Sequence, residues 1–299
     1  IRVLIFPTVV TTCDAGPVDS PPAGPRDRLK KVHTPMFDVL LARIQQKYQT
    51  MKFPEGPPPG LPSRFVGRPV ITAGNCPPGC AGCVEACPTG ALAQEDGLRL
   101  DLGRCLFCSE CAAVCAVKNI SFTADYRMAT RSRDDLLIDS GPFRPAQPLE
   151  VRLKRLFGRS LRLRQVSAGG CNACEADTNV LGTIGWDLGR FGIQFVASPR
   201  HADGLLITGP VPENMRLALL KTYEAVPAPK LVIAVGACAI SGGPYAGHAE
   251  VHDGAAGLLP VDLFIPGCPP QPLTILDGLL RLIGRLETSV GDQVLQSSL

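Results

Sequence analysis

The second half of the chain alternates short apolar runs with longer segments of helical periodicity. Residues 161–166 alternate apolar and polar side chains, as a strand does. Four further runs are almost entirely apolar and are bounded by Gly, Pro or Ser: residues 193–197, 204–207, 231–235 and 261–265. Such runs are typical of parallel strands covered on both faces, and residues 213–226 and 271–286 have helical spacing. The pattern predicts a doubly wound α/β domain over residues 161–299.

The beginning of the chain has no such alternation. Residues 1–10 are apolar but broken by Arg2 and Pro7, and residues 11–34 are rich in Pro and Gly. Residues 36–51 have apolar positions at helical spacing with Gln, Lys and Arg opposite, which predicts one amphipathic helix. This helix either docks on a membrane or a partner, or presents a solvated basic face. We therefore expect an extended arm with one helix over residues 1–60.

Residues 61–127 form a third pattern. Leu98, Leu100 and Leu102 alternate with polar residues and predict a short strand, and residues 119–122 predict another strand that closes a small α+β unit. Residues 128–160 contain several prolines and Gly141. We expect them to form a linker between this unit and the α/β domain.

Composition narrows the class of protein. The chain has 299 residues, 45% of them hydrophobic and 19% charged, which favours a subunit whose surface is partly covered by partners. The net charge of +3 is too small to indicate nucleic acid as a partner. No window reaches the roughly 20 apolar residues of a spanning helix, so we expect no transmembrane segment in this chain.

The cysteines are the strongest indication of function, because eight of the 13 lie between residues 76 and 115. Three thiolates two or three residues apart can hold three corners of an iron–sulfur cube, and one loop does not comfortably supply the fourth. In two-cluster bacterial ferredoxins the fourth Cys of each run serves the other cluster. We therefore predict two [4Fe–4S] clusters, one held by Cys76, Cys80, Cys83 and Cys115, the other by Cys105, Cys108, Cys111 and Cys87.

Other uses of these thiols stay open. Zinc would need two tetrahedral sites of four thiolates each, and eight thiols this close in sequence would crowd two such sites. Disulfide frameworks are typical of small secreted chains, unlike this one. The gap from Cys76 to Cys80 is one residue wider than in the ferredoxin pattern, and Ala116 follows Cys115 where Pro is usual. Neither departure removes a ligand. Thiol-rich clusters are assembled under reducing conditions, which indicates the cytoplasm.

The cysteines of the α/β domain follow predicted strands. Cys171 and Cys174 come after residues 161–166, Cys238 after 231–235, and Cys268 after 261–265. Ligands of open α/β sheets bind outside the carboxyl ends of the strands, so these four thiols are expected to converge. We predict a third [4Fe–4S] cluster there, with zinc or unligated thiols as alternatives. Cys13 stands alone in the arm and is expected to be unligated.

These segments resemble two subunits of the membrane-bound, complex I-related [NiFe]-hydrogenases joined in one chain. Residues 35–127, with Leu102-Gly103-Arg104-Cys105, resemble the bacterial-type 2[4Fe–4S] ferredoxin subunit. Residues 155–287 resemble the flavodoxin-like hydrogenase small subunit, which is homologous to the terminal-cluster subunit of respiratory complex I. This second resemblance is carried by Phe157-Gly158-Arg159-Ser160, Cys171-Asn172-Ala173-Cys174-Glu175, Ser198-Pro199-Arg200-His201-Ala202-Asp203, Val235-Gly236-Ala237-Cys238 and Pro266-Gly267-Cys268-Pro269-Pro270.

One detail separates the close relatives. The complex I subunit carries two adjacent cysteines in its first ligand loop, whereas Cys171 and Cys174 are two residues apart and precede Glu175, as in hydrogenase small subunits. Ala173 stands where relatives often have Gly, and residues 176–187 match the family poorly.

The resemblance implies partners and a location. In the family the [NiFe] centre belongs to a separate hydrogenase large subunit. The implied function is electron transfer through three clusters between an electron-donor protein or subunit and that centre, where protons are reduced or hydrogen is oxidised. Membrane-embedded complex I-like subunits and the cytoplasmic face of the inner membrane are implied as well. The alternatives are a complex I-like oxidoreductase without nickel, passing electrons to quinone or another acceptor, and a free-standing electron carrier.

For several charged residues the sequence leaves two interpretations open. Glu175 resembles a glutamate that relays protons at the subunit interface, or it is a carboxylate at a helix N-terminus. Arg200, His201 and Asp203 resemble a group at the cluster edge and interface, or they form surface ion pairs. The basic residues between 152 and 164 form a solvated face or dock on an acidic partner.

Overall fold

The computed structural model describes residues 35–72, 76–77, 79–94, 97–158 and 160–286. Its contacts divide the chain into residues 1–47 and residues 48–299. Residues 1–34, with most of the predicted arm and Cys13, lie outside the described residues. Within the described part of the first unit, α1 spans Pro35–Gln46 and exposes Phe37, Leu40 and Ile44. The predicted helix ran on to residue 51, but Lys47 has a φ of 54°, a left-handed conformation that ends helices.

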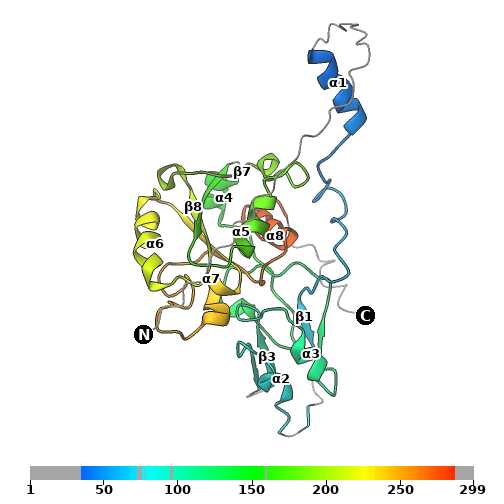
Figure 1. Ribbon diagram of the computed structural model, residues 1–299, viewed down its shortest axis with the longest axis vertical. Helices are drawn as coiled ribbons and strands as arrows, with labels where there is room; N and C mark the ends of the chain where they lie inside the picture. The colour runs from blue at the N-terminus through cyan, green and yellow to red at the C-terminus, as the bar shows by residue number, and fades with distance from the viewer. Residues whose placement is uncertain (1–34, 73–75, 78, 95–96, 159, 287–299) are drawn as a thin grey trace, which may run out of the picture. The chain divides into compact units, whose positions relative to one another are not determined.

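The α/β domain contains a parallel sheet of five strands (Figure 1). The strands are β6 (Leu161–Ser167), β7 (Ile193–Phe195), β8 (Gly204–Thr208), β9 (Leu231–Val235) and β10 (Leu263–Ile265). Their order is β10-β9-β8-β6-β7, and every neighbouring pair is parallel. Numbered along the domain, this is the order 2-1-3-4-5 of flavodoxin-like sheets. The sheet agrees with the α/β class predicted from the apolar runs.

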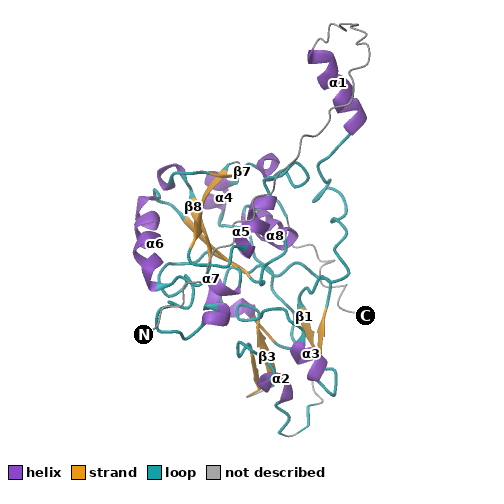
Figure 2. Cartoon of the chain, in the orientation of Figure 1, coloured by secondary structure: helices purple, strands orange, loops and turns teal. Residues whose placement is uncertain are grey.

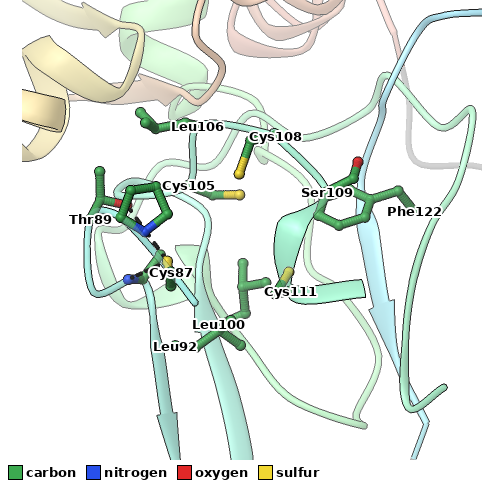
Figure 3. A pocket seen from close by; sticks show the side chains of 12 residues that line it. Cys87, Thr89, Leu92, Leu100, Cys105, Leu106, Cys108, Ser109, Cys111 and Phe122 are labelled. Carbon is green, nitrogen blue, oxygen red and sulfur yellow. Dashed lines mark hydrogen bonds between the residues drawn. The ribbon is translucent and has the colours of Figure 1, made fainter. Parts of the chain in front are cut away.

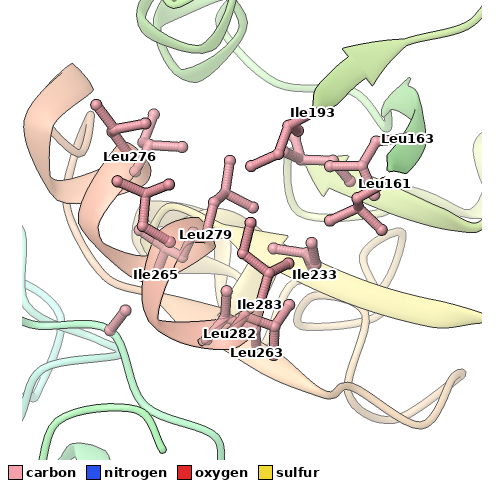
Figure 4. Close-up of a cluster of buried hydrophobic side chains, with 14 of the residues drawn as sticks. Leu161, Leu163, Ile193, Ile233, Leu263, Ile265, Leu276, Leu279, Leu282 and Ile283 are labelled. Carbon is pink, nitrogen blue, oxygen red and sulfur yellow. The ribbon is translucent and has the colours of Figure 1, made fainter. Parts of the chain in front are cut away.

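Helices cover the sheet and complete the core. They are α4 (Val151–Phe157), α5 (Ala173–Val180), α6 (Glu213–Ala225), α7 (Ala237–Ser241) and α8 (Pro272–Leu282). Figure 4 shows Leu276 and Leu279 of α8 on the side of the helix that faces Ile233 and Ile265 of the sheet. β8 and β9 are buried along their whole length. Burial of both faces explains why their sequences are continuous apolar runs.

Residues 61–127 form short elements around the cysteine runs (Figure 2). The strand β1 (Pro69–Ile71) pairs antiparallel with β4 (Ile120–Phe122), and β2 (Leu92–Gln94) pairs with β3 (Leu98–Asp101). Two short helices, α2 (Gly82–Glu85) and α3 (Glu110–Val114), end just before Cys87 and Cys115. The strands predicted at residues 98–102 and 119–122 are therefore present, and each is slightly shorter than predicted.

The segment predicted as a linker holds packed structure. The strand β5 (Leu137–Ile138), after the 3₁₀ turn η1 (Asp134–Leu136), pairs with β3, so residues 61–127 and the predicted linker share one sheet. Thr130 forms a β-bridge with Phe264 of β10, and the side chain of Thr130 is fully buried. A two-residue strand leaves no periodic signal, which is why the Pro-rich sequence suggested a linker. The domain boundaries themselves stay a prediction.

The end of the predicted arm also packs against the α/β domain. Phe53 is only 5% exposed and belongs to the same core cluster as the sheet. The guanidinium of Arg190, in the 3₁₀ turn η2 (Leu188–Phe191), donates hydrogen bonds to the carbonyls of Met51 and Phe53. Residues 48–53 are thus fixed by backbone carbonyls, which sequence patterns do not reveal. Among the described residues, no helix is both long and apolar enough to cross a membrane.

Candidate functional site

The thiols predicted for the second cluster surround one space (Figure 3). Their sulfur atoms come from the loop before α3, from α3 itself and from the second residue after α2, and the set is Cys87, Cys105, Cys108 and Cys111. Two backbone N–H groups already point at these sulfurs: Ala91 N lies 3.2 Å from Cys87 Sγ, and Phe107 N lies 3.3 Å from Cys105 Sγ. Hydrogen bonds of this kind stabilise negative charge on sulfur. These two donors would therefore offset part of the cost of burying thiolates at Cys87 and Cys105.

The thiols predicted for the first cluster also gather. Cys83 is 5% exposed, and the neighbours that act electrostatically on it are Cys115, Cys76 and Cys80. Asn119 serves two of these sulfurs. Its backbone N–H donates to Cys115 Sγ at 3.3 Å, and its side-chain amide donates to Cys76 Sγ at 3.2 Å. Sequence reasoning missed Asn119, although its place four residues after the last Cys of the run was a usable signal.

Burial raises the pKa of three of these thiols, Cys83, Cys105 and Cys111. Desolvation is the largest cause, because an apolar environment disfavours the charged thiolate, and neighbouring thiols of the same set add to the rise. The pKa of Cys105 is raised to about 12, and that of Cys111 to about 11. A thiolate in such surroundings needs a cation to compensate it, which positively charged iron would provide.

The four thiols of the α/β domain meet at the carboxyl edge of the sheet, as the topology predicted. Cys171 precedes α5, Cys174 lies in its first turn, Cys238 lies in α7 after β9, and Cys268 follows β10. Burial is the largest cause that raises the pKa of Cys174 and Cys238, the latter to about 11, and the other thiols of the set contribute to both shifts. Cys171 and Cys268 are exposed, so part of this site faces outward.

Gly236 allows one of these thiols its position. It is the residue between β9 and α7, and its φ of 90° is a conformation that L side chains rarely adopt. A Cβ at this position would lie 2.6 Å from Cys174 Sγ. Glycine is therefore required both by the turn and by the sulfur that lies against it.

Glu175 is buried behind the thiol site and held by two hydroxyls. Ser167 at the end of β6 and Thr208 at the end of β8 donate hydrogen bonds to its Oε1 at 2.6 and 2.7 Å. Burial alone would raise the pKa of Glu175, but these hydrogen bonds, with a backbone N–H of the first helical turn, hold that pKa below its usual value. The position in the first turn of α5 fits the helix-terminus interpretation. Sequence reasoning missed Thr208, whose hydroxyl stands out in an otherwise apolar run.

The group Arg200, His201 and Asp203 lies elsewhere. These residues belong to the 3₁₀ turn η3 (Pro199–His201) and to the connection that enters β8, which is the amino end of that strand. The carboxylate of Asp203 accepts a hydrogen bond from Arg162 N at 2.7 Å. The cluster-edge interpretation is therefore wrong, because the thiols follow the carboxyl ends of the strands, and these residues precede β8.

The chemistry of the donors suits iron–sulfur clusters. Among the residues described, no three His, Cys, Asp or Glu side chains stand close enough to hold a single metal ion. A [4Fe–4S] cube binds four thiolates, one at each of its irons. Each gathered set offers four cysteine thiols, and N–H donors point at sulfurs of the first two sets. That these sets bind such cubes stays a prediction.

Comparison with known proteins concerns the α/β domain. Residues 171–282 match the family described as NADH ubiquinone oxidoreductase, 20 Kd subunit. The probable membrane-bound hydrogenase subunit mbhJ of Pyrococcus furiosus is 38% identical over 149 residues, which cover 49% of this chain and 89% of that protein.

Two further relatives carry names from both branches of this group. Formate hydrogenlyase subunit 7 of Escherichia coli is 40% identical over 142 residues, which cover 48% of this chain and 56% of that protein. An NADH-quinone oxidoreductase subunit of Clostridium beijerinckii is 44% identical over 114 residues, 38% of this chain and 68% of that protein. Each of these matches therefore covers less than half of the chain.

The fold and site define an α/β protein whose parallel sheet presents a cysteine site at its carboxyl edge. The sequence matches place it more narrowly. The chain belongs to the NADH ubiquinone oxidoreductase 20 Kd subunit family, whose matched relatives include subunits of hydrogenases and of NADH-quinone oxidoreductases. Its cysteine-rich region fits iron–sulfur binding.

Proposed function

We propose that this protein is the electron-transfer subunit of a membrane-associated [NiFe]-hydrogenase complex. In this proposal residues 61–127 act as a two-cluster ferredoxin domain and residues 161–299 as the small-subunit domain. The observation that carries it is the gathering of twelve cysteines into three sets of four within one unit of the fold. Bound [4Fe–4S] clusters would supply one-electron oxidation and reduction at each set.

In this proposal the three thiol sets act in series. Cys111 of the middle set interacts electrostatically with Cys83 of the first set. On the other side, Gly103, two residues before Cys105, is hydrogen-bonded to Ser241 at the end of α7, the helix that carries Cys238. This arrangement supports a route from the set of Cys83, through that of Cys105, to that of Cys238.

The polypeptide would tune this route. Buried surroundings disfavour extra negative charge, whereas N–H groups of Ala91, Phe107 and Asn119 aimed at sulfur favour it. The two effects oppose each other at the sets of Cys83 and Cys105. Their balance, set residue by residue, would separate the reduction potentials of the three clusters.

Glu175 supports a proton path next to the last set. Its carboxylate is ionised at neutral pH, since its pKa is held low, and so can accept a proton at Oε2 while Oε1 is occupied by hydroxyls. An open groove lined by Arg164, Asn172 and Glu175 reaches this carboxylate from the surface. We propose that Glu175 passes protons between this groove and the partner's metal.

The partners follow from the relatives' names. The hydrogenase large subunit would cover the outward side of Cys171 and Cys268, which this chain leaves exposed. Membrane-embedded complex I-like subunits would hold the complex at the cytoplasmic face of the inner membrane, and a donor protein or subunit would deliver electrons to the set of Cys83. The names of relatives from Pyrococcus furiosus and Escherichia coli support a hydrogenase assembly.

A second candidate function has a specific observation in its favour. The 44% identity with an NADH-quinone oxidoreductase subunit supports a complex I-like enzyme without nickel, in which electrons pass to quinone or another acceptor. The spacing of Cys171 and Cys174, through which this chain resembles hydrogenase small subunits, supports the hydrogenase.

Purification of the intact complex under anaerobic conditions tests both. We expect about twelve irons per chain, as three cubes require, together with nickel and hydrogen turnover. Cys174→Ser should abolish turnover and remove one cluster signal, while Cys13→Ser serves as the matched control and should change neither. Iron without nickel or hydrogen turnover would favour the second candidate. Zinc in place of iron would contradict both.

A further inference from the structure

A hydrogen bond joins the residues just before Cys105 to those just after Cys238. The hydroxyl of Ser241, the last residue of α7, donates a hydrogen bond to the carbonyl of Gly103 over 2.8 Å. It also lies 3.2 Å from the carbonyl of Ala237. Because serine has one hydroxyl hydrogen, the shorter bond to Gly103 is the stronger of the two. Ser241 is 9% exposed, so water competes little for this bond.

The backbone of Gly103 approaches α7 as closely as glycine permits. A Cβ at this position would lie 2.7 Å from Cγ2 of Ile240 and 3.0 Å from Cζ of Arg133. Ile240 is 2% exposed and belongs to one core cluster with Cys105 and Cys111. Side chains around the middle thiol set therefore pack directly on the helix of the last set.

An ion pair between Asp101 and Arg133 also holds the Gly103 loop. Asp101 Oδ1 accepts hydrogen bonds from Gly103 N and from Arg133 Nη1, each at 2.8 Å, and Arg133 Nη2 binds the second carboxylate oxygen. A bidentate arginine–carboxylate pair has a defined geometry. Arg133 belongs to the segment that the sequence suggested was a linker. That segment thus fixes the loop that meets α7.

We propose that Ser241 and Gly103 are positioning residues that set the separation and coupling between the thiol set of Cys105 and that of Cys238. The path between the two sets is short: Gly103 lies two residues before Cys105, and Ser241 lies three residues after Cys238. Electron transfer weakens steeply with distance and favours bonded contacts over gaps. The hydrogen bond and the missing side chain together keep this gap closed. The inference rests on the proposed function, because it concerns electron transfer between bound clusters.

Substitution of Ser241 tests the hydrogen bond. Ser241→Ala removes the hydroxyl at nearly constant volume, Ser241→Thr retains it, and Ser121→Ala, at the exposed position of β4, is the matched control. In the anaerobic complex, paramagnetic resonance would report the spin–spin interaction between the two clusters, and photoreduction the rate of electron arrival at the last one. We expect a weaker interaction and a several-fold slower rate in Ser241→Ala, recovery in Ser241→Thr, and no change in the control.

Substitution of Gly103 tests the contact independently. Gly103→Ala would force α7 and the loop apart, whereas Gly257→Ala, in open space, is the matched control. We expect Gly103→Ala to weaken the interaction, and a second change, Ile240→Ala, to restore part of it by removing Cγ2. Iron-loaded variants with unchanged interaction and rate would overturn the positioning role alone. A wild-type protein without iron would overturn the proposed function and this inference with it.

Discussion

The cysteines of residues 76–115 and those of the α/β domain are brought together by different means. In the first region the ligands stand a few residues apart on short loops, so the local sequence gathers most of each set. In the α/β domain Cys171 and Cys268 are far apart in sequence and meet because β6, β9 and β10 end at the same edge of one sheet. One site therefore depends on spacing, and the other depends on the whole fold.

This difference predicts a difference in what stabilises each region. Around the first two thiol sets, strands have two to four residues and helices four or five. Elements this short bury little apolar surface, and small metal-binding units often fold only with their metal. The α/β domain has three fully buried strands, β8, β9 and β10, and the buried helix α8. Its stability comes from packing.

Removal of iron should have the largest effect and should separate the two regions. We expect chelation to abolish amide hydrogen-exchange protection in α2, α3 and β4, because the raised pKa values of Cys105 and Cys111 show that these buried sites do not favour bare thiolates. Strands β8 and β9 should stay protected. The measurement is hydrogen exchange of matched iron-loaded and iron-free samples. Equal loss of protection in both regions would show that the α/β domain depends on metal as well.

A buried ion pair in α8 tests the packing of the α/β domain. Asp277 and Arg281 are 1% and 4% exposed, and Arg281 Nε donates to Asp277 Oδ2 at 2.9 Å. Asp277→Ala should lower the free energy of unfolding by about 3–5 kcal/mol, because Arg281 would lose its carboxylate partner in a buried site. The double change Asp277→Leu with Arg281→Met should recover most of that loss. Urea unfolding followed by the fluorescence of Trp186, the single tryptophan, measures both.

The same pair should give a pH dependence. Burial raises the pKa of Asp277 to about 6, although Arg281 and Arg127 lower it. Between the unfolded value of about 3.9 and about 6, the folded state binds more protons than the unfolded state. Stability from this group should therefore fall as pH rises through that window. The urea midpoint of Asp277→Asn, measured at pH values between about 3.9 and about 6, should lack this dependence on pH. If the variant keeps the same pH dependence, groups other than Asp277 cause it.

Gly236→Ala should affect only the thiol site of the α/β domain, which depends on the whole fold. A side chain at the φ of 90° and ψ of 155° of Gly236 costs about 1–3 kcal/mol, and its Cβ would displace Cys174 Sγ. We expect loss of about four irons per chain, one cube, while the signals of the other two clusters persist. Iron analysis with paramagnetic resonance measures this. Gly185→Ala is the control, because no atom lies within 4 Å of the Cβ it would add. An intact third cluster in Gly236→Ala would contradict the expectation that a Cβ there displaces Cys174 Sγ.

The sequence predicted the regions unequally. The five strands of the sheet were found because burial on both faces leaves apolar runs, and the thiol sets because spacing and strand ends are visible in the sequence. The contacts that join the regions were not found. β5 is too short to be periodic, and Ser241, Arg133 and Arg190 act through backbone carbonyls or a single carboxylate. Such partners depend on where the chain folds back, which no local pattern records.

Asn119→Ala should have the smallest effect and should show whether a local site can be tuned locally. The substitution removes the side-chain donor to Cys76 Sγ, but the backbone donor to Cys115 Sγ remains. Loss of one hydrogen bond costs about 0.5–1.5 kcal/mol, and a thiolate with one donor fewer disfavours the added electron. We expect the reduction potential of the first cluster to become more negative and that of the cluster at Cys238 to stay unchanged. Redox titration followed by paramagnetic resonance resolves the two, with exposed Asn179→Ala as control. Equal shifts of both potentials would mean that the two sites are coupled through the fold. The distinction between a site assembled by local spacing and one assembled by the whole fold would then apply to the placement of the thiols but not to their reduction potentials.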